Sequence, residues 1–81
     1  MDEIEKRVRG VIKQVAPQLE PSFSASADLF RDLGVKSASA LDLLLGLEEE
    51  FGVSIPDDAF VEARTTSQIT TVVSTLVSSA A

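Results

Sequence analysis

The 81-residue sequence contains no cysteine, no histidine, no tyrosine and no tryptophan. Without cysteine the chain cannot form a disulfide or a thiolate metal site. Without histidine it lacks the commonest general base, the commonest zinc ligand and any Ser–His or Cys–His pair. We therefore expect no catalytic residue and no metal site in this chain.

Length and charge restrict the organisation further. A chain of 81 residues can bury one modest core, so we expect a single domain over residues 1–81. The net charge is −6, and from Pro17 onward ten acidic residues stand against three basic ones. Such a surface repels phosphate backbones and anionic lipid, so we expect no nucleic acid or membrane partner. No apolar run reaches the length of a membrane span, so we expect a cytoplasmic protein, and a monomer.

Apolar residues at helical spacing predict a first helix from Asp2 to about Ala16. Asp2 and Glu5 fit a capping box, and Pro17 ends the helix. The apolar face is formed by Ile4, Val8, Val11, Ile12 and Val15.

Residues 17–36 have no regular period and are rich in proline, serine and alanine. A connection of this length is unusual in a compact domain unless it packs down or has a function. We expect a long ordered loop, pinned by Leu29, Phe30 and Leu33, with a short helical turn near Asp28.

The next helix is predicted from Ser37 to Phe51, with Gly52 as its C-terminal stop and Val53 folding back on the last turn. Its expected inner face comprises Ala40, Leu41, Leu44, Leu47 and Phe51. Asp42, Glu49 and Glu50 should face outward.

After an extended stretch, Asp57 is expected to cap a short third helix through Phe60 and Val61. A fourth helix begins at Thr65, Thr66 or Ser67, and its end from Ser78 onward is expected to fray. Residues 70–73 have strand-like propensity, but the helical spacing of Ile69, Val72, Val73, Leu76 and Val77 favours a helix. The sequence therefore predicts an all-α fold, an antiparallel four-helix bundle of three main helices and one short one, with the long loop between the first and second.

One serine, Ser37, stands where a turn becomes the acidic second helix. Taken alone, it is most simply an N-cap residue, and Ser39 with Asp42 could form an alternative capping box. Nothing nearby could deprotonate its hydroxyl. An exposed hydroxyl on a rigid helix start could instead be an attachment point for a phosphodiester, with Gly34 allowing the tight turn before it.

The order and spacing of four segments resemble those of the acyl carrier protein family, of the fatty-acid or polyketide type. The segments are Asp32-Leu33-Gly34, then Ser37, then residues 47–52 (LEEEFG), then Ile55-Pro56-Asp57-Asp58. The resemblance implies that Ser37 receives 4'-phosphopantetheine from coenzyme A and that the thiol of this arm carries acyl groups. It also implies four kinds of partner: a phosphopantetheinyl transferase, acyl-loading enzymes, ketosynthases and tailoring enzymes. The initial Met1 favours a free-standing protein over a segment of a larger synthase.

Two residues beside Ser37 depart from the family pattern. The family usually shows Asp-Ser-Leu, whereas this chain has Lys36-Ser37-Ala38. The lysine reverses a charge, and the alanine removes apolar area that a partner would bury, on the order of 1 kcal/mol or more. We expect these changes to restrict which transferase accepts the protein, as in a carrier dedicated to a specialised pathway.

The resemblance further implies that one side of the second helix docks onto basic patches of partner enzymes. The expected docking residues are Lys36, Ala38, Leu41, Asp42, Leu45 and Glu49. Charge runs are more often simply solvated, and docking is given less weight for Glu48 and Glu50 than for Asp42 and Glu49.

The expected core around the second and third helices comprises Leu44, Leu47, Phe51, Ile55, Phe60 and Val61. In carrier proteins the space between these helices can also shelter an acyl chain. Asp57 and Asp58 lack the spacing of a calcium loop. The alternative to a carrier is an unmodified helical interaction module that has lost the arm.

Overall fold

The computed structural model describes residues 3–80, with the side chain of Ala80 left out. The elements are α1 (Glu3–Val15), a 3₁₀ turn η1 (Ser37–Ser39), α2 (Ala40–Phe51), α3 (Asp57–Glu62) and α4 (Thr66–Ala80). The described residues form no strand, and the one bridge between extended backbones joins Asp28 to Thr65. The predicted all-α fold with three main helices and one short one is confirmed. The proposed cap residue Asp2 lies outside the described residues.

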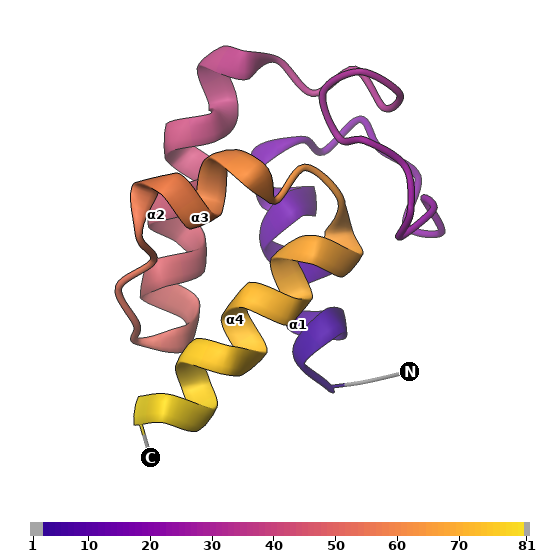
Figure 1. The fold of residues 1–81 in the computed structure, drawn as a ribbon. Coiled ribbons are helices and arrows are strands. Elements are labelled where there is room, and N and C mark those ends of the chain that lie inside the picture. Colours follow the sequence, from indigo (N-terminus) through magenta and orange to yellow (C-terminus); the bar gives the residue numbers. More distant parts are fainter. Residues whose placement is uncertain (1–2, 81) are drawn as a thin grey trace.

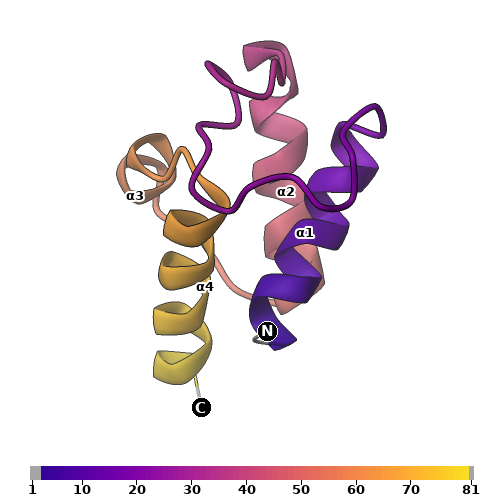
Figure 2. The ribbon, with the colours of Figure 1, turned by 90° about the vertical axis from the view of Figure 1, so that its right-hand side faces the viewer.

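The three long helices pack side by side, with α1 against both α2 and α4. Figures 1 and 2 show α1 running antiparallel to the other two, so the start of α1 and the end of α4 lie at the same end of the bundle. After α2 the chain returns along its side and crosses in α3, which is why α4 runs in the same direction as α2. The predicted antiparallel packing therefore holds for α1 against each of its neighbours.

The predicted inner faces of α1 and α4 are confirmed. Val8 and Ile12 of α1 and Ile69 and Val73 of α4 are at most 2% exposed. The other residues predicted for these faces are partly buried against the same core, except Val11, which is fully buried.

The inner face of α2 differs from the prediction at two leucines, because Leu41 was expected to be buried and Leu43 was not. Leu43 and Leu47 are buried, whereas Leu41 is 61% exposed. Five leucines between positions 41 and 47 almost encircle this helix, so their spacing does not single out one face. The close approach of α1 determines which face is buried. A Cβ on Gly46 would lie 2.9 Å from Cγ1 of Val11, so only glycine allows the two helices to pack this closely.

The expected core around α3 is only partly confirmed. Leu47 and Ile55 are buried, but Leu44, Phe51 and Phe60 are half-buried and Val61 is 69% exposed. The reason is that α3 has six residues and lies across the bundle, so one of its sides stays at the surface.

The end of α2 follows the prediction. Gly52 adopts φ 65° and donates its N–H to the carbonyl of Glu48 at 2.8 Å. Val53 folds back to donate to the same carbonyl and packs half-buried against the core. The Glu48 carboxylate also accepts the N–H of Ile55 at 2.8 Å, so this side chain holds the extended connection to α3.

Two predicted helix starts are wrong. Ser37 is the first residue of η1, whose N-cap is Lys36, and α2 begins only at Ala40. Neither Ser37 nor the N-cap residue Ser39 caps the backbone with its side chain. Similarly, Asp57 is the first residue of α3, and the N-cap position is taken by Pro56, which has no side chain that could cap the helix. Pro56 has φ −60° and ψ 139°, an extended conformation that the fixed φ of proline allows, so the helix begins one residue later.

The start of α4 is a capping box. Thr65 Oγ1 accepts the N–H of Gln68 at 3.1 Å, and Gln68 Oε1 accepts the N–H of Thr65 at 3.2 Å. Thr65 was one of three predicted starts. The helix α4 runs through residues 70–73, so the prediction of a helix and not a strand is confirmed. It continues to Ala80, so the expected fraying from Ser78 is not found over the described residues.

The long loop is ordered as expected. Leu29 is fully buried, and Phe30 and Leu33 are partly buried against the core. The carbonyl of Asp28 accepts the N–H groups of Asp32 at 2.9 Å and Leu33 at 3.1 Å, which closes the predicted helical turn. The loop is also tied to the start of α4, because Leu29 donates to the carbonyl of Arg64 at 2.9 Å.

Candidate functional site

Ser37 presents a free hydroxyl at the surface. The residue is exposed, and its carbonyl accepts the N–H of Ala40. Within residues 3–80 its side-chain oxygen has no hydrogen-bond partner, since the turn is held by the backbone alone. The hydroxyl is therefore available to another enzyme without loss of any contact in the fold.

The backbone before Ser37 is fixed by a buried residue two positions earlier. Val35 is 5% exposed and donates its N–H to the carbonyl of Leu29 at 2.9 Å. Gly34 adopts φ 74°, a conformation that residues with a Cβ rarely adopt, and this turns the chain into the buried position. The serine thus projects from an anchored segment and not from a free loop.

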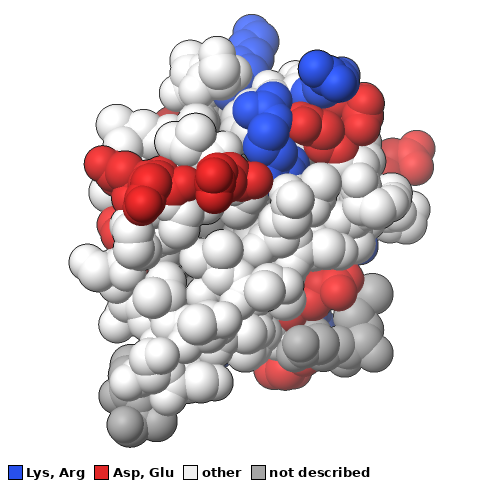
Figure 3. Space-filling model, in the orientation of Figure 1, with Lys and Arg blue, Asp and Glu red and all other residues white. Residues whose placement is uncertain are grey.

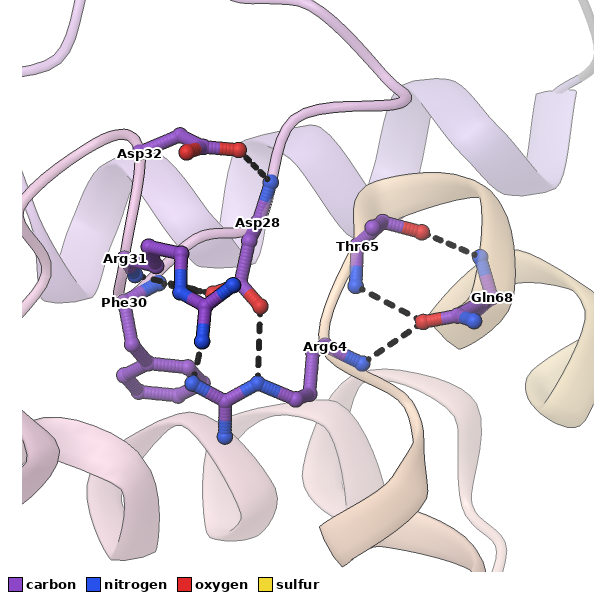
Figure 4. A network of polar contacts seen from close by, with 7 residues as sticks. All are labelled: Asp28, Phe30, Arg31, Asp32, Arg64, Thr65 and Gln68. Atoms are coloured by element: carbon purple, nitrogen blue, oxygen red, sulfur yellow. Dashed lines mark hydrogen bonds and ion pairs between the residues drawn. The ribbon is translucent and has the colours of Figure 1, made fainter.

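A network of polar contacts lies next to this segment (Figure 4). Arg64, between α3 and α4, donates from Nε to Asp28 Oδ2 at 2.7 Å and from Nη2 to Oδ1 at 3.3 Å. Its guanidinium carbon lies 5.1 Å from the ring centre of Phe30. The hydrogen bond from Arg64 and the backbone N–H of Arg31 lower the pKa of Asp28 to about 2.

A hollow of about 440 Å³ opens between α2 and α3, and Ser37 stands at its edge. Its lining is mostly apolar and consists of Phe30, Ser37, Ala40, Leu41, Leu44, Asp57, Phe60, Val61 and Arg64. The exposed side chains Leu41 and Val61 belong to this lining, which explains why two residues expected in the core are at the surface.

The six predicted docking residues are all exposed: Lys36, Ala38, Leu41, Asp42, Leu45 and Glu49. Helical geometry places the last four on the side of α2 opposite its buried residues Leu43 and Leu47. Within the described chain neither Asp42 nor Glu49 forms an ion pair.

The two glutamates given less weight have structural partners. Glu48 holds the backbone of Ile55, and Glu50 pairs with Arg7 at 2.9 Å. Arg7 also lies over the ring of Phe51, with its guanidinium carbon 4.4 Å from the ring centre. These contacts across α1 and α2 were not predicted, because nothing in the local pattern joins residues 43 positions apart.

Sequence reasoning also missed Arg64 and its contacts with Asp28 and Phe30. One local signal was available, since Thr65 and Gln68 have the spacing of a capping box and would have fixed the residue before them at a helix start. The pairing with Asp28 spans 36 positions and has no such signal.

Residues 6–73 match the family described as "Phosphopantetheine attachment site". The chain belongs to this family. Its prosthetic group is 4'-phosphopantetheine, attached covalently, and its role is that of a phosphopantetheine carrier. The exposed, unbonded hydroxyl of Ser37 beside an apolar hollow fits such a group.

The face of the carrier formed by α3 and α4 is unevenly charged. Figure 3 shows acidic side chains gathered along α3, whereas the adjoining surface of α4 has no charged residue. Among residues 3–80, no three histidine, cysteine or acidic side chains gather as metal ligands. No helix in this part of the chain is long and apolar enough to cross a membrane.

Proposed function

We propose that the protein is an acyl carrier protein: one domain over residues 1–81 that bears 4'-phosphopantetheine on Ser37 and presents acyl groups to partner enzymes. The observation that supports this choice of residue is the free, exposed hydroxyl of Ser37 inside the segment that matches the family. When bound, the group supplies a thiol that holds acyl chains as thioesters.

The carrier contributes position and not catalysis. Val35 and the turn at Gly34 hold the serine still, so a transferase meets its hydroxyl in one place. No side chain among the described residues hydrogen-bonds the Ser37 hydroxyl, and we infer that the transferase supplies the base and the magnesium ion. We infer that the protein is not itself an enzyme.

Recognition is assigned to the outer side of η1 and α2. Asp42 and Glu49, which have no ion pair in the described chain, would steer basic partners, mainly by accelerating encounter. Leu41 and Leu45 offer apolar surface to a partner, and burying this surface would contribute about 25 cal/mol of binding free energy per Å². Lys36 and Ala38 stand beside the attachment point, where their difference from the family pattern would select the transferase.

The partners we propose are a phosphopantetheinyl transferase, acyl-loading enzymes, ketosynthases and tailoring enzymes of a fatty-acid or polyketide-type pathway. Of the two, we favour the polyketide type, because Lys36 and Ala38 suit a carrier dedicated to a specialised pathway. The protein would act as a cytoplasmic monomer. Its acidic surface supports protein partners over nucleic acid or membrane.

Intact-mass measurement after incubation with coenzyme A and a broad-specificity transferase tests this function. The wild-type chain and a Ser39→Ala control should gain one phosphopantetheinyl group, and Ser37→Ala should gain none. Ser39 is a matched control because it lies in the same turn and its side chain caps nothing. If the wild-type chain is never modified, the result favours the alternative hypothesis of an unmodified helical interaction module.

A further inference from the structure

The hollow between α2 and α3 is not uniformly apolar. Phe30, Leu44 and Phe60 contribute hydrocarbon to the lining, whereas Asp57 and Arg64 bring charged groups to it. Arg64 is the one basic residue of this lining. A purely apolar occupant would therefore leave a charged donor facing it.

Two of the three guanidinium nitrogens of Arg64 are held by Asp28. Nε and Nη2 donate to its carboxylate at 2.7 and 3.3 Å, and the Phe30 ring lies beside the group. Nη1 has no hydrogen-bond partner within residues 3–80, and Figure 4 shows Arg64 paired with Asp28 beside the ring of Phe30. Arg64 thus lines the hollow with its guanidinium paired to Asp28 through two nitrogens and with half of its side-chain surface exposed.

Resting on the proposed function, we propose that Arg64 selects the acyl cargo: it favours a chain bearing a second carbonyl oxygen, beyond that of the thioester, over a saturated chain. A saturated chain that covers Nη1 removes water from this donor and offers nothing in return. A β-oxo group offers an acceptor while its remaining carbons contact Leu44 and Phe60. The cargo enters from the edge where Ser37 stands, so carrier and selecting residue share one hollow.

The donor suits a neutral acceptor better than a carboxylate. Asp28 already balances the charge of Arg64, and Asp57 adds a negative charge to the same lining. A carboxylate in the hollow would lie near two acidic groups, Asp28 and Asp57, with Arg64 as the one cation among them, and the repulsion would disfavour its binding. We therefore assign the site to oxo-acyl chains and not to acyl chains that end in a carboxylate.

The test compares octanoyl, β-oxo-octanoyl and malonyl groups loaded on the arm, with loading verified by intact mass. Exchange of each thioester with N-acetylcysteamine is timed and divided by the rate for the same thioester on free pantetheine. Wild-type protein should protect the β-oxo chain roughly fivefold to tenfold more than the octanoyl chain, which is the net effect of one ordinary hydrogen bond at this half-exposed side chain. Malonyl should gain no such protection.

Variants assign the effect to the guanidinium. Arg64→Gln should remove the extra protection, whereas Arg31→Gln should keep it, because Arg31 lies in the same loop network but not in the lining. Equal protection of octanoyl and β-oxo-octanoyl by the wild type would overturn the proposal. So would an equal loss in both variants, or protection of malonyl above β-oxo-octanoyl.

A second measurement needs neither the variants nor attachment. The β-oxo-octanoyl and octanoyl thioesters of N-acetylcysteamine are titrated into the unmodified chain and followed by heteronuclear NMR. The Arg64 Nε–H signal should move with the β-oxo compound and not with octanoyl or free N-acetylcysteamine. No difference between the compounds overturns the selection by Arg64, while a failure to load Ser37 counts only against the proposed function.

Discussion

Leu43 and Leu45 of α2 allow the buried and exposed sides of the helix to be tested with the same substitution. Leu43 is 1% exposed and belongs to the core, whereas Leu45 is 53% exposed. Leu43→Ala should lower the free energy of unfolding by about 3 kcal/mol, from lost transfer free energy and the cavity left behind. Leu45→Ala should lower it by no more than about 0.5 kcal/mol.

The assay is urea unfolding followed by far-UV circular dichroism, with both variants compared with the wild type at one protein concentration. A chain of 81 residues has a thin margin of stability, so Leu43→Ala should shift the midpoint strongly or abolish the native baseline. Leu45→Ala should instead slow modification by the transferase, because this side chain is assigned to docking. Equal destabilisation by the two variants would refute the orientation of α2 and the docking side with it.

Three further outcomes are expected. The pKa of Asp28 is lowered from 3.8 to about 2, so its ion pair contributes stability that is present above about pH 4 and is lost as the pH falls from about 4 to about 2. Thermal unfolding should therefore show a steeper acid decline for wild type than for Asp28→Asn. The double variant Asp42→Asn, Glu49→Gln should slow transferase encounter severalfold at low salt, and the difference should shrink as ionic strength rises to about 0.15 M; a constant ratio would contradict steering. The double variant Lys36→Asp, Ala38→Leu should change modification rates unequally across a panel of transferases, whereas equal rates with every one would count against selection.

The sequence was sufficient where the pattern is local. The period of α1, the stop at Gly52 and the helical spacing in α4 each depend on residues within a few positions of one another. The same holds for the tight turn at Gly34, which lies three positions before Ser37. Local chemistry of this kind can be predicted without knowing what packs against it.

The sequence did not predict features of the fold that depend on contact with a distant segment of the chain. The leucines of α2 surround the helix, and only the close approach of α1 at Gly46 determines which are buried. The exposure of Val61 depends on how a six-residue helix lies across the bundle. The pairing of Arg64 with Asp28 joins two turns far apart in the chain, so no local spacing could reveal the donor in the hollow.

The claim that one defined hydroxyl carries the prosthetic group is tested most directly by locating that group. Fragmentation mass spectrometry of the modified protein should place the phosphopantetheinyl group on Ser37 in every modified molecule. Its presence on Ser39 or on a serine of α4 would contradict the account, and so would a protein that a panel of transferases leaves unmodified.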